Sequence, residues 1–227
     1  NLSLKRSDAS TPLDWVNISF ILITPLVGLL GTSWYVYHYG VTWLELGNFL
    51  MMFLLTGVCI TGGYHRLFAH RAFQASPLIR FFALFFGAGA LEQSALVWAS
   101  QHRDHHRYVD TERDPYNIKQ GFWYAHMGWM LLRHEQPTTT NVKDLLADPL
   151  IRHQHRYYLL WALAAGVLLP LAIGALTGHL LGAFLLLVVE EDIAGTADAD
   201  DALRAGHDPL GAGLVVEGQG HVDDGAA

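Results

Sequence analysis

The chain has 227 residues, of which 52% are hydrophobic, 12% aromatic and only 15% charged. Soluble domains carry roughly 25% charged residues, so this composition, with a mean hydropathy of +0.23, argues against a soluble protein and indicates an integral membrane protein. The single cysteine, Cys59, excludes an internal disulfide framework and a zinc site built on cysteines. The thirteen histidines, nearly as many as the fourteen Lys and Arg, require an explanation.

Uncharged runs predict where the chain crosses the bilayer, because a spanning helix needs about 20 apolar residues. Three runs are long enough, and a fourth begins after a break at Thr177 and Gly178 but is cut short at Glu190. The predicted spans cover about residues 18–37, 46–64 and 157–176, with a partial fourth span at 179–189. We therefore predict an all-α integral membrane domain over residues 1–189, a four-helix bundle whose fourth helix is truncated.

The last segment, residues 190–227, has a different character. It holds ten acidic residues against one base, Arg204, and contains no aromatic residue. Such a segment cannot bury enough apolar area to offset its ordering entropy, which predicts a disordered tail.

The distribution of Lys and Arg predicts the orientation in the membrane. Eleven of the fourteen lie in residues 65–156, between the second and third spans, and the turn at 38–41 has none. The positive-inside rule then places the N-terminus and the 65–156 segment, a helical cap, in the cytoplasm. Within the cap, residues 81–91 are apolar but too few to span, and residues 121–132 are predicted to form one interfacial helix. The Gly62-Gly63 pair is predicted to end the second span.

Five histidines of the cap fall in two clusters. His65 and His70 have the spacing H-x4-H, and His102, His105 and His106 have the spacing H-x2-H-H. At about 100° per residue, the second cluster occupies a single arc of about 100° on a helix, so its three imidazoles face one point. The first pair lies about 140° apart on an ideal helix, which calls for a distorted helix end or for two different metals.

These clusters indicate metal chemistry. Neutral imidazole is a good ligand for iron, copper, zinc and nickel, and a site without thiolates and poor in carboxylates does not suit calcium, magnesium or iron–sulfur clusters. A structural zinc takes four ligands, so five clustered histidines indicate two metal ions. Arg103 and Arg107 fit either a positive surface or a contact with an anionic headgroup. Six other histidines are interpreted as hydrogen-bonded interfacial residues: His38, His126, His134, His153, His155 and His179.

Four stretches, HRLFAH, HRDHH, DPYN and HMGWMLLRH, resemble the membrane acyl-CoA desaturases of the stearoyl-CoA Δ9 type, in the form found in bacteria. The resemblance covers about residues 15–189. It implies a four-helix membrane fold with a cytoplasmic cap, two non-haem iron ions held by three histidine boxes, and an O2-dependent reaction that introduces a cis double bond into a saturated acyl chain. The implied partners are an acyl-CoA or other acyl-lipid substrate, O2, a separate electron-donor protein and the lipid bilayer of a bacterial inner membrane. No nucleic-acid partner is expected.

Carried over residue by residue, the resemblance assigns the iron ligands to His65, His70, His102, His105 and His106. Trp98 matches a tryptophan near the acyl-CoA site, Gln93 sits where the family often has an amide, and Arg133 matches a basic residue that faces the CoA phosphates. Arg103 joins these three as a candidate for substrate binding. Ser100 stands where some members have an arginine.

The third histidine box of the family, H-N-x-H-H, has no counterpart here, because only His207 and His221 follow the fourth span. Five histidines are too few for two irons, so we expect a truncated or frame-shifted reading of a desaturase that is inactive on its own. Two alternatives stay open. One is a membrane hydroxylase or alkane monooxygenase that uses the same ligands, and the other is a non-catalytic membrane fragment that binds one metal.

Overall fold

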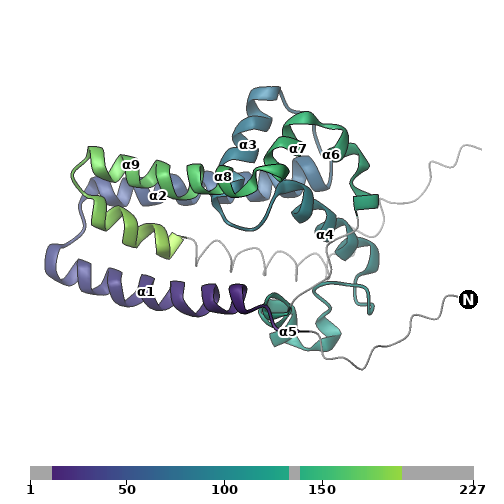
Figure 1. The fold of residues 1–227 in the computed structure, drawn as a ribbon, viewed down its shortest axis with the longest axis horizontal. Coiled ribbons are helices and arrows are strands. Elements are labelled where there is room, and N and C mark those ends of the chain that lie inside the picture. The colour runs from purple at the N-terminus through teal and green to yellow at the C-terminus, as the bar shows by residue number, and fades with distance from the viewer. Residues whose placement is uncertain (1–11, 133–138, 191–227) are drawn as a thin grey trace, which may run out of the picture.

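The computed structural model describes residues 12–132 and 139–190, and the secondary structure of these residues is helical, without a β-strand. Three of its helices are long and apolar enough to cross a membrane: Trp15–Tyr39, Trp43–Ala69 and Tyr158–Leu176. They run along the long axis of the molecule in Figure 1, and a group of shorter helices gathers at one end. The predicted all-α membrane fold is therefore confirmed.

The first two spans begin at polar caps. The first, α1 (Trp15–Tyr39), starts after Asp14, whose carboxylate accepts from two backbone N–H groups of the first turn, and it ends at Gly40 with φ 73°. The second begins with α2 (Trp43–Val58), where Thr42 and Glu45 form a reciprocal capping box. Only Gly28 and Tyr35 of α1 are buried, as expected of a helix that faces lipid.

The second span continues past the predicted end. A π-helix, η1 (Cys59–Ala69), follows α2 without a break, so the expectation that Gly62 and Gly63 end the helix is wrong. Gly63 instead allows α3 to approach, because a Cβ added at this position would lie 2.8 Å from the Cβ of Ala83.

The third span is a composite helix, made of α8 (Tyr158–Ala162), the π-helix η5 (Leu163–Leu168) and α9 (Leu169–Leu176). The predicted break after it is confirmed, since Gly178 turns the chain with φ 78°. A shorter apolar helix, Leu180–Glu190, then runs back along the spans. Apart from Glu190, the predicted acidic tail lies outside the described residues.

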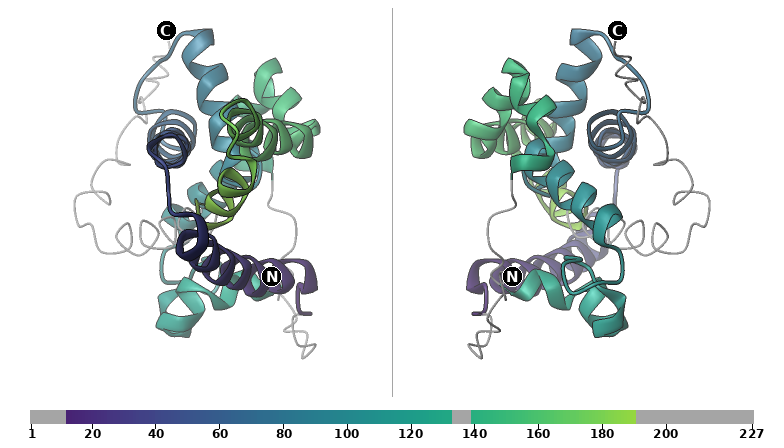
Figure 2. Two further views of the ribbon diagram at one scale, coloured as in Figure 1. Left: turned by 90° about the vertical axis from the view of Figure 1, so that its left-hand side faces the viewer. Right: turned by 90° about the vertical axis from the view of Figure 1, so that its right-hand side faces the viewer.

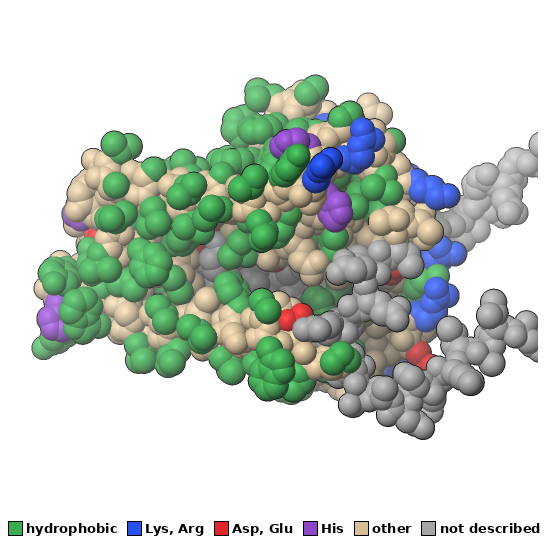
Figure 3. Space-filling model, viewed as in Figure 1, with side chains coloured by type: hydrophobic (Ala, Val, Ile, Leu, Met, Phe, Trp, Pro, Cys, Tyr) green, Lys and Arg blue, Asp and Glu red, His purple; other side chains and the backbone are tan. Residues whose placement is uncertain are grey.

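The cap lies at one end of the spans. Its larger helices are α3 (Pro77–Gly89), α4 (Ala95–Tyr108) and α7 (Pro149–Arg156), with α6 (Lys143–Ala147) between α4 and α7 in the chain. Hydrophobic side chains cover the spans in the view of Figure 3, whereas Lys and Arg gather over the cap. The short apolar segment is α3, as predicted.

The predicted interfacial helix is not continuous. The short helix η2 (Ile118–Gln120) precedes it, and the segment itself divides into α5 (Phe122–His126) and η3 (Gly128–Leu131). Met127, with φ −130°, separates the two pieces. This region holds the start of α1, because Asp14 N donates to Leu131 O at 2.9 Å and Asn17 Nδ2 to Met130 O at 3.2 Å.

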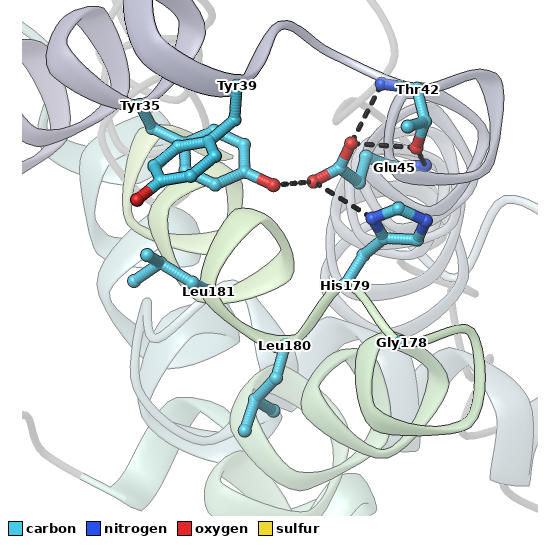
Figure 4. A pocket seen from close by; sticks show the side chains of 8 residues that line it. All are labelled: Tyr35, Tyr39, Thr42, Glu45, Gly178, His179, Leu180 and Leu181. Atoms are coloured by element: carbon cyan, nitrogen blue, oxygen red, sulfur yellow. Dashed lines mark hydrogen bonds and ion pairs between the residues drawn. The ribbon is translucent and has the colours of Figure 1, made fainter.

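Polar contacts tie the spans together at the end away from the cap. The carboxylate of Glu45, in α2, accepts from Tyr35 Oη of α1 at 2.5 Å and from the backbone N–H of Thr42 at 2.8 Å, and it faces His179 beyond the third span (Figure 4). Farther along, Asn48 Nδ2 donates to Pro170 O at 3.2 Å. Polar groups buried between membrane helices stabilise their association, since lipid offers no competing partner.

Near the cap, the third span packs closely against α3. A Cβ added to Gly166 would lie 2.7 Å from the carbonyl oxygen of Gly89 and 3.1 Å from its Cα, so both glycines are needed for this approach. The two views of Figure 2 show the cap helices packed around this end of the spans.

We expect Gly166→Ala to destabilise the protein by about 1–3 kcal/mol, because the added methyl must push two backbones apart. The matched control is Gly47→Ala, in α2, where an added Cβ meets nothing within 4 Å. That change should be neutral or stabilising, because alanine favours helix. Thermal unfolding of the two variants in detergent checks the difference, and equal melting temperatures would contradict it.

Candidate metal centre

The first histidine pair lies on the π-helix at the end of the second span. The backbone N–H of His70 donates to the carbonyl of His65 at 2.9 Å, which closes a turn of five residues. Residues five apart are splayed on an α-helix, but in this wider turn they share a face, and the two ring centroids lie 4.6 Å apart. The distortion that the sequence demanded is therefore a π-helix.

The second cluster lies on α4, an ordinary α-helix that begins after the capping residue Ser94. His102 and His106 are four residues apart and therefore on one face, with ring centroids 4.6 Å apart. His102 is 6% exposed, and His106 lies at the more open side.

Four histidines converge, two from each helix: His65, His70, His102 and His106. One ligand nitrogen from each lies within 4.8 Å of the others. The Nε2 atom of His102 is 3.0 Å from that of His70 and 3.0 Å from that of His106. In a tetrahedral site with metal–nitrogen bonds of 2.0–2.1 Å, ligand nitrogens are about 3.3 Å apart, so this spacing fits one metal ion.

Electrostatics favours neutral rings in this cluster. Burial lowers the pKa of His102 far below its usual range, and the neighbouring histidines lower it further. Burial, helped by nearby His106, also lowers the pKa of His70, and burial with neighbouring His105 lowers the pKa of His106. A metal ion binds the unprotonated imidazole, so these shifts keep the ligands available near neutral pH.

His105 does not join the four. Its ring centroid lies 6.5 Å from that of His102, and its Nδ1 is 2.7 Å from Asp114 Oδ1. Both side chains are buried, and His105 Nε2 is buried without a hydrogen-bond partner among the described residues. The three imidazoles of the second cluster therefore do not all face one point, although the His105 ring lies only 5.7 Å from that of His106. His105 instead offers one free nitrogen beside the cluster, oriented by a carboxylate, which fits a ligand of a second ion.

The other predicted site residues have varied positions. Trp98 is 7% exposed and stacks on His102, with ring centroids 4.8 Å apart and planes at 16°. Gln93 lies in the loop between α3 and α4, with φ 77°, and its backbone N–H donates to Tyr158 Oη at 3.0 Å. Arg103 points along α4 into a network of carbonyl and carboxylate oxygens. Arg133 lies outside the described residues.

Three polar residues around the clusters escaped the sequence analysis. Asp114, which the sequence analysis named only within the DPYN stretch, is the partner of His105 and also accepts from the backbone N–H groups of Asp110 and Tyr116. Asn141 and Asp144 lie in the connector that precedes α7, residues 139–148, and their side chains contact α4. The only signal for Asp114 was its place in the DPYN stretch.

Comparison with known proteins decides the family. The sequence model of the fatty acid desaturase family matches residues 42–190, more than half of the chain and the part that contains both histidine clusters. The chain belongs to the fatty acid desaturase family. The four-histidine cluster is thus part of a desaturase domain.

Curated relatives agree with this assignment. Acyl-CoA desaturase 1 of Saccharomyces cerevisiae is 40% identical over 163 residues, which is 70% of this chain and 31% of the relative. The sn-1 stearoyl-lipid 9-desaturase of Anabaena variabilis is 32% identical over 69% of this chain and 57% of its own length. Human stearoyl-CoA desaturase 5 is 38% identical over 47% of this chain and 34% of its own length. The chain thus spans about a third to just over half of these relatives.

We expect His102→Ala to lower the affinity of the purified chain for Fe²⁺ or Co²⁺ by more than about tenfold, because it removes the ligand at the centre of the four. His38→Ala is the matched control, since His38 lies at the far end of α1, where its Nδ1 hydrogen-bonds with the carbonyl of Trp34. Equilibrium dialysis followed by metal analysis checks the result. Equal metal content in the two variants would show that His102 is not a metal ligand.

We expect Asp114→Asn to destabilise the fold by about 1–3 kcal/mol, because the amide has one acceptor fewer and leaves a buried donor without a partner. Asp110→Asn is the control. Asp110 has φ 59°, a conformation that asparagine adopts readily. Thermal unfolding of the metal-free chain should separate the two variants, and an unchanged melting temperature for Asp114→Asn would show that the contact with His105 is dispensable.

Proposed function

We propose that this chain provides the membrane part and the first metal-binding cluster of an O2-dependent fatty acyl desaturase that uses two non-haem iron ions. The observation that carries the proposal is the convergence of His65, His70, His102 and His106 within the residues matched by the family. An all-histidine group suits iron as well as copper, zinc and nickel, and the match to the desaturase family favours iron among them.

The substrate is a saturated fatty acyl chain, carried either as a CoA thioester or in a lipid. The names of the relatives include both an acyl-CoA desaturase and a stearoyl-lipid 9-desaturase, which favours a cis double bond at the ninth carbon. Two hydrogens leave adjacent methylene groups, and a separate donor protein supplies two electrons, with two protons from solvent. Together with O2 these give the alkene and two molecules of water.

Iron, when bound, supplies the oxygen activation needed to break an unactivated C–H bond, which amino-acid side chains cannot do. The residues of the chain hold and shield it. The four clustered histidines would bind one ion, and His105, oriented by Asp114, would contribute to the second. Trp98 covers one face of His102 and excludes water there, which keeps the cluster in an apolar setting beside the spans.

We further propose that the cap and the N-terminus lie on the cytoplasmic side of a bacterial inner membrane. Support comes from the Lys and Arg residues that gather over the cap, in contrast to the uncharged turn between the first two spans. The electron donor and a CoA-linked substrate would then reach the histidine clusters from the cytoplasm.

Two alternatives remain. The enzymatic alternative is a hydroxylase or alkane monooxygenase that uses the same ligands, and the second alternative is a non-catalytic membrane fragment that binds metal. Product analysis separates the first from a desaturase, because hydroxylation adds one oxygen atom to the chain whereas desaturation removes two hydrogens. Iron stoichiometry separates the second, because two irons per chain favour the enzyme.

We expect residues 1–227 alone, reconstituted with ferrous iron and an electron donor, to convert no stearoyl-CoA above background. The clusters offer five histidine nitrogens, whereas two irons with room for O2 need more. Joining the chain to the C-terminal part of the Anabaena relative should restore an octadecenoyl product measured by mass spectrometry, and His102→Ala in that fusion should abolish it. Turnover by the chain alone would contradict the first expectation, and a hydroxylated product would contradict the proposed function.

A further inference from the structure

The side chain of Arg103, on α4, reaches the end of η1 and is largely buried, with 15% of the side chain exposed. A guanidinium has five N–H donors in a fixed planar fork. All five are used within the chain. Nε donates to Ala69 O at 2.9 Å, Nη2 to Phe68 O at 2.8 Å and Nη1 to Asn141 O at 2.6 Å. The remaining two bind Asp144 in a bidentate pair at 2.8 and 3.0 Å.

Two of these acceptors belong to the helix that carries the first cluster. Phe68 and Ala69 directly precede His70, and the last carbonyls of a helix lack partners within the helix. Arg103 supplies those partners from the turn of α4 that carries His102 and His106. A single side chain therefore joins the end of η1 to the second cluster at the point where the rings of His70 and His102 meet.

Asp144 fixes the guanidinium from the opposite side. Its carboxylate also binds Arg71 at 2.9 Å, so it contacts the residue after His70 and the residue after His102 together. Burial opposes the ionisation of Asp144, but the hydrogen bonds and charge of Arg103, with the charge of Arg71, outweigh it and hold its pKa below the usual range. The carboxylate is ionised near neutral pH and is not free to turn away.

The connector around Asp144 is itself bound to α4. Asn141 Nδ2 donates to Ser100 O and to Asp104 Oδ1, each at 2.9 Å, and Asn141 Oδ1 accepts from Ser100 Oγ at 2.8 Å. The connector thus forms a brace along α4, and buried Val142 and Leu145 fix it further in the hydrophobic core.

We propose that Arg103 is a positioning residue that sets the separation between His70 and the His102–His106 pair, with Asp144 as its anchor. The inference rests on the proposed metal-binding function of the four histidines. It replaces the substrate-binding role expected for Arg103 from the sequence, because the five donors that would hold an anionic group are already engaged. Arg103 acts through His70 and has no contact with the reacting atoms.

The test is an anaerobic titration of the purified full chain in lipid nanodiscs with Co²⁺, followed by visible absorption. Arg103→Gln should weaken Co²⁺ binding by about 10- to 100-fold and change the absorption bands, because the ligand nitrogens lose their spacing. Asp144→Asn should change the Co²⁺ affinity and the absorption bands in the same direction as Arg103→Gln, but by a smaller amount. The matched control is Arg107→Gln, on the same helix, where the guanidinium lies over the ring of Tyr108, and it should bind as the wild type does.

Two further variants separate positioning from charge. Arg103→Lys keeps the charge but has only three donors, all on one nitrogen. These donors cannot bind two helix carbonyls, the carbonyl of Asn141 and both oxygens of Asp144 together. The variant should therefore not restore the wild-type Co²⁺ absorption spectrum. The double variant Arg103→Gln with Asp144→Asn should bind Co²⁺ no more weakly than Arg103→Gln alone, because both changes break the same unit.

Wild-type affinity and bands in Arg103→Gln would overturn the proposal, and weaker acyl-CoA binding with normal Co²⁺ binding would assign Arg103 to the substrate instead. If circular dichroism shows that Arg103→Gln fails to fold, Asp144→Asn decides, and wild-type Co²⁺ binding by that folded variant overturns the proposal. If the wild-type chain binds neither Co²⁺ nor Fe²⁺, the proposed function itself is contradicted. If the wild type binds metal and the variants bind it equally well, only the role proposed for Arg103 is contradicted.

Discussion

The geometry of the histidine cluster depends on one backbone hydrogen bond, from the N–H of His70 to the carbonyl of His65. With the usual bond to the fourth residue back, these two rings would point in directions about 140° apart, and only one could meet α4. The wider turn brings both to the same side, so a pair spaced by five on η1 faces a pair spaced by four on α4. Every later feature of the site, including the 3.0 Å approach of His70 to His102, presupposes this turn.

A widened turn at the end of a membrane span creates a second requirement. Backbone carbonyls at the end of the helix must find donors, and near lipid there is little water to provide them. Arg103 meets this need for Phe68 and Ala69. At the other end of α4, buried Gln154 accepts from Ala95 N and donates to Tyr64 Oη. The contacts of Arg103 and Gln154 hold α4 to η1 at both ends of α4. The same contacts therefore give partners to backbone groups and keep the histidines of the two helices aligned.

The sequence predicted the spans well because a membrane span leaves a local signal, an uncharged run of sufficient length. The two histidine clusters were also visible, since their members lie within six residues of each other. The π-helix was visible only as a conflict between the spacing of His65 and His70 and the α-helical period. The separation of His105 from the four was hidden, because it depends on Asp114, which lies beyond the end of α4.

Contacts between residues far apart in the chain could not be predicted from the sequence pattern. From the sequence, Arg103 fitted a surface cation or a contact with an anionic group, because its acceptors, Phe68, Ala69 and Asp144, lie 34 to 41 positions away. The break in the predicted 121–132 helix had one local marker, Gly128, a poor helix former that directly follows Met127.

The location of the brace bears on how the protein is made. The groups described above that hold the two histidine-bearing helices together lie between Tyr64 and Gln154, and the third span begins only at Tyr158. Chains leave the ribosome from the N-terminus at about 5–20 residues per second, slowly compared with the docking of neighbouring helices. The contacts that bring the four histidines together can therefore form before the third span and the helix after it have packed against them.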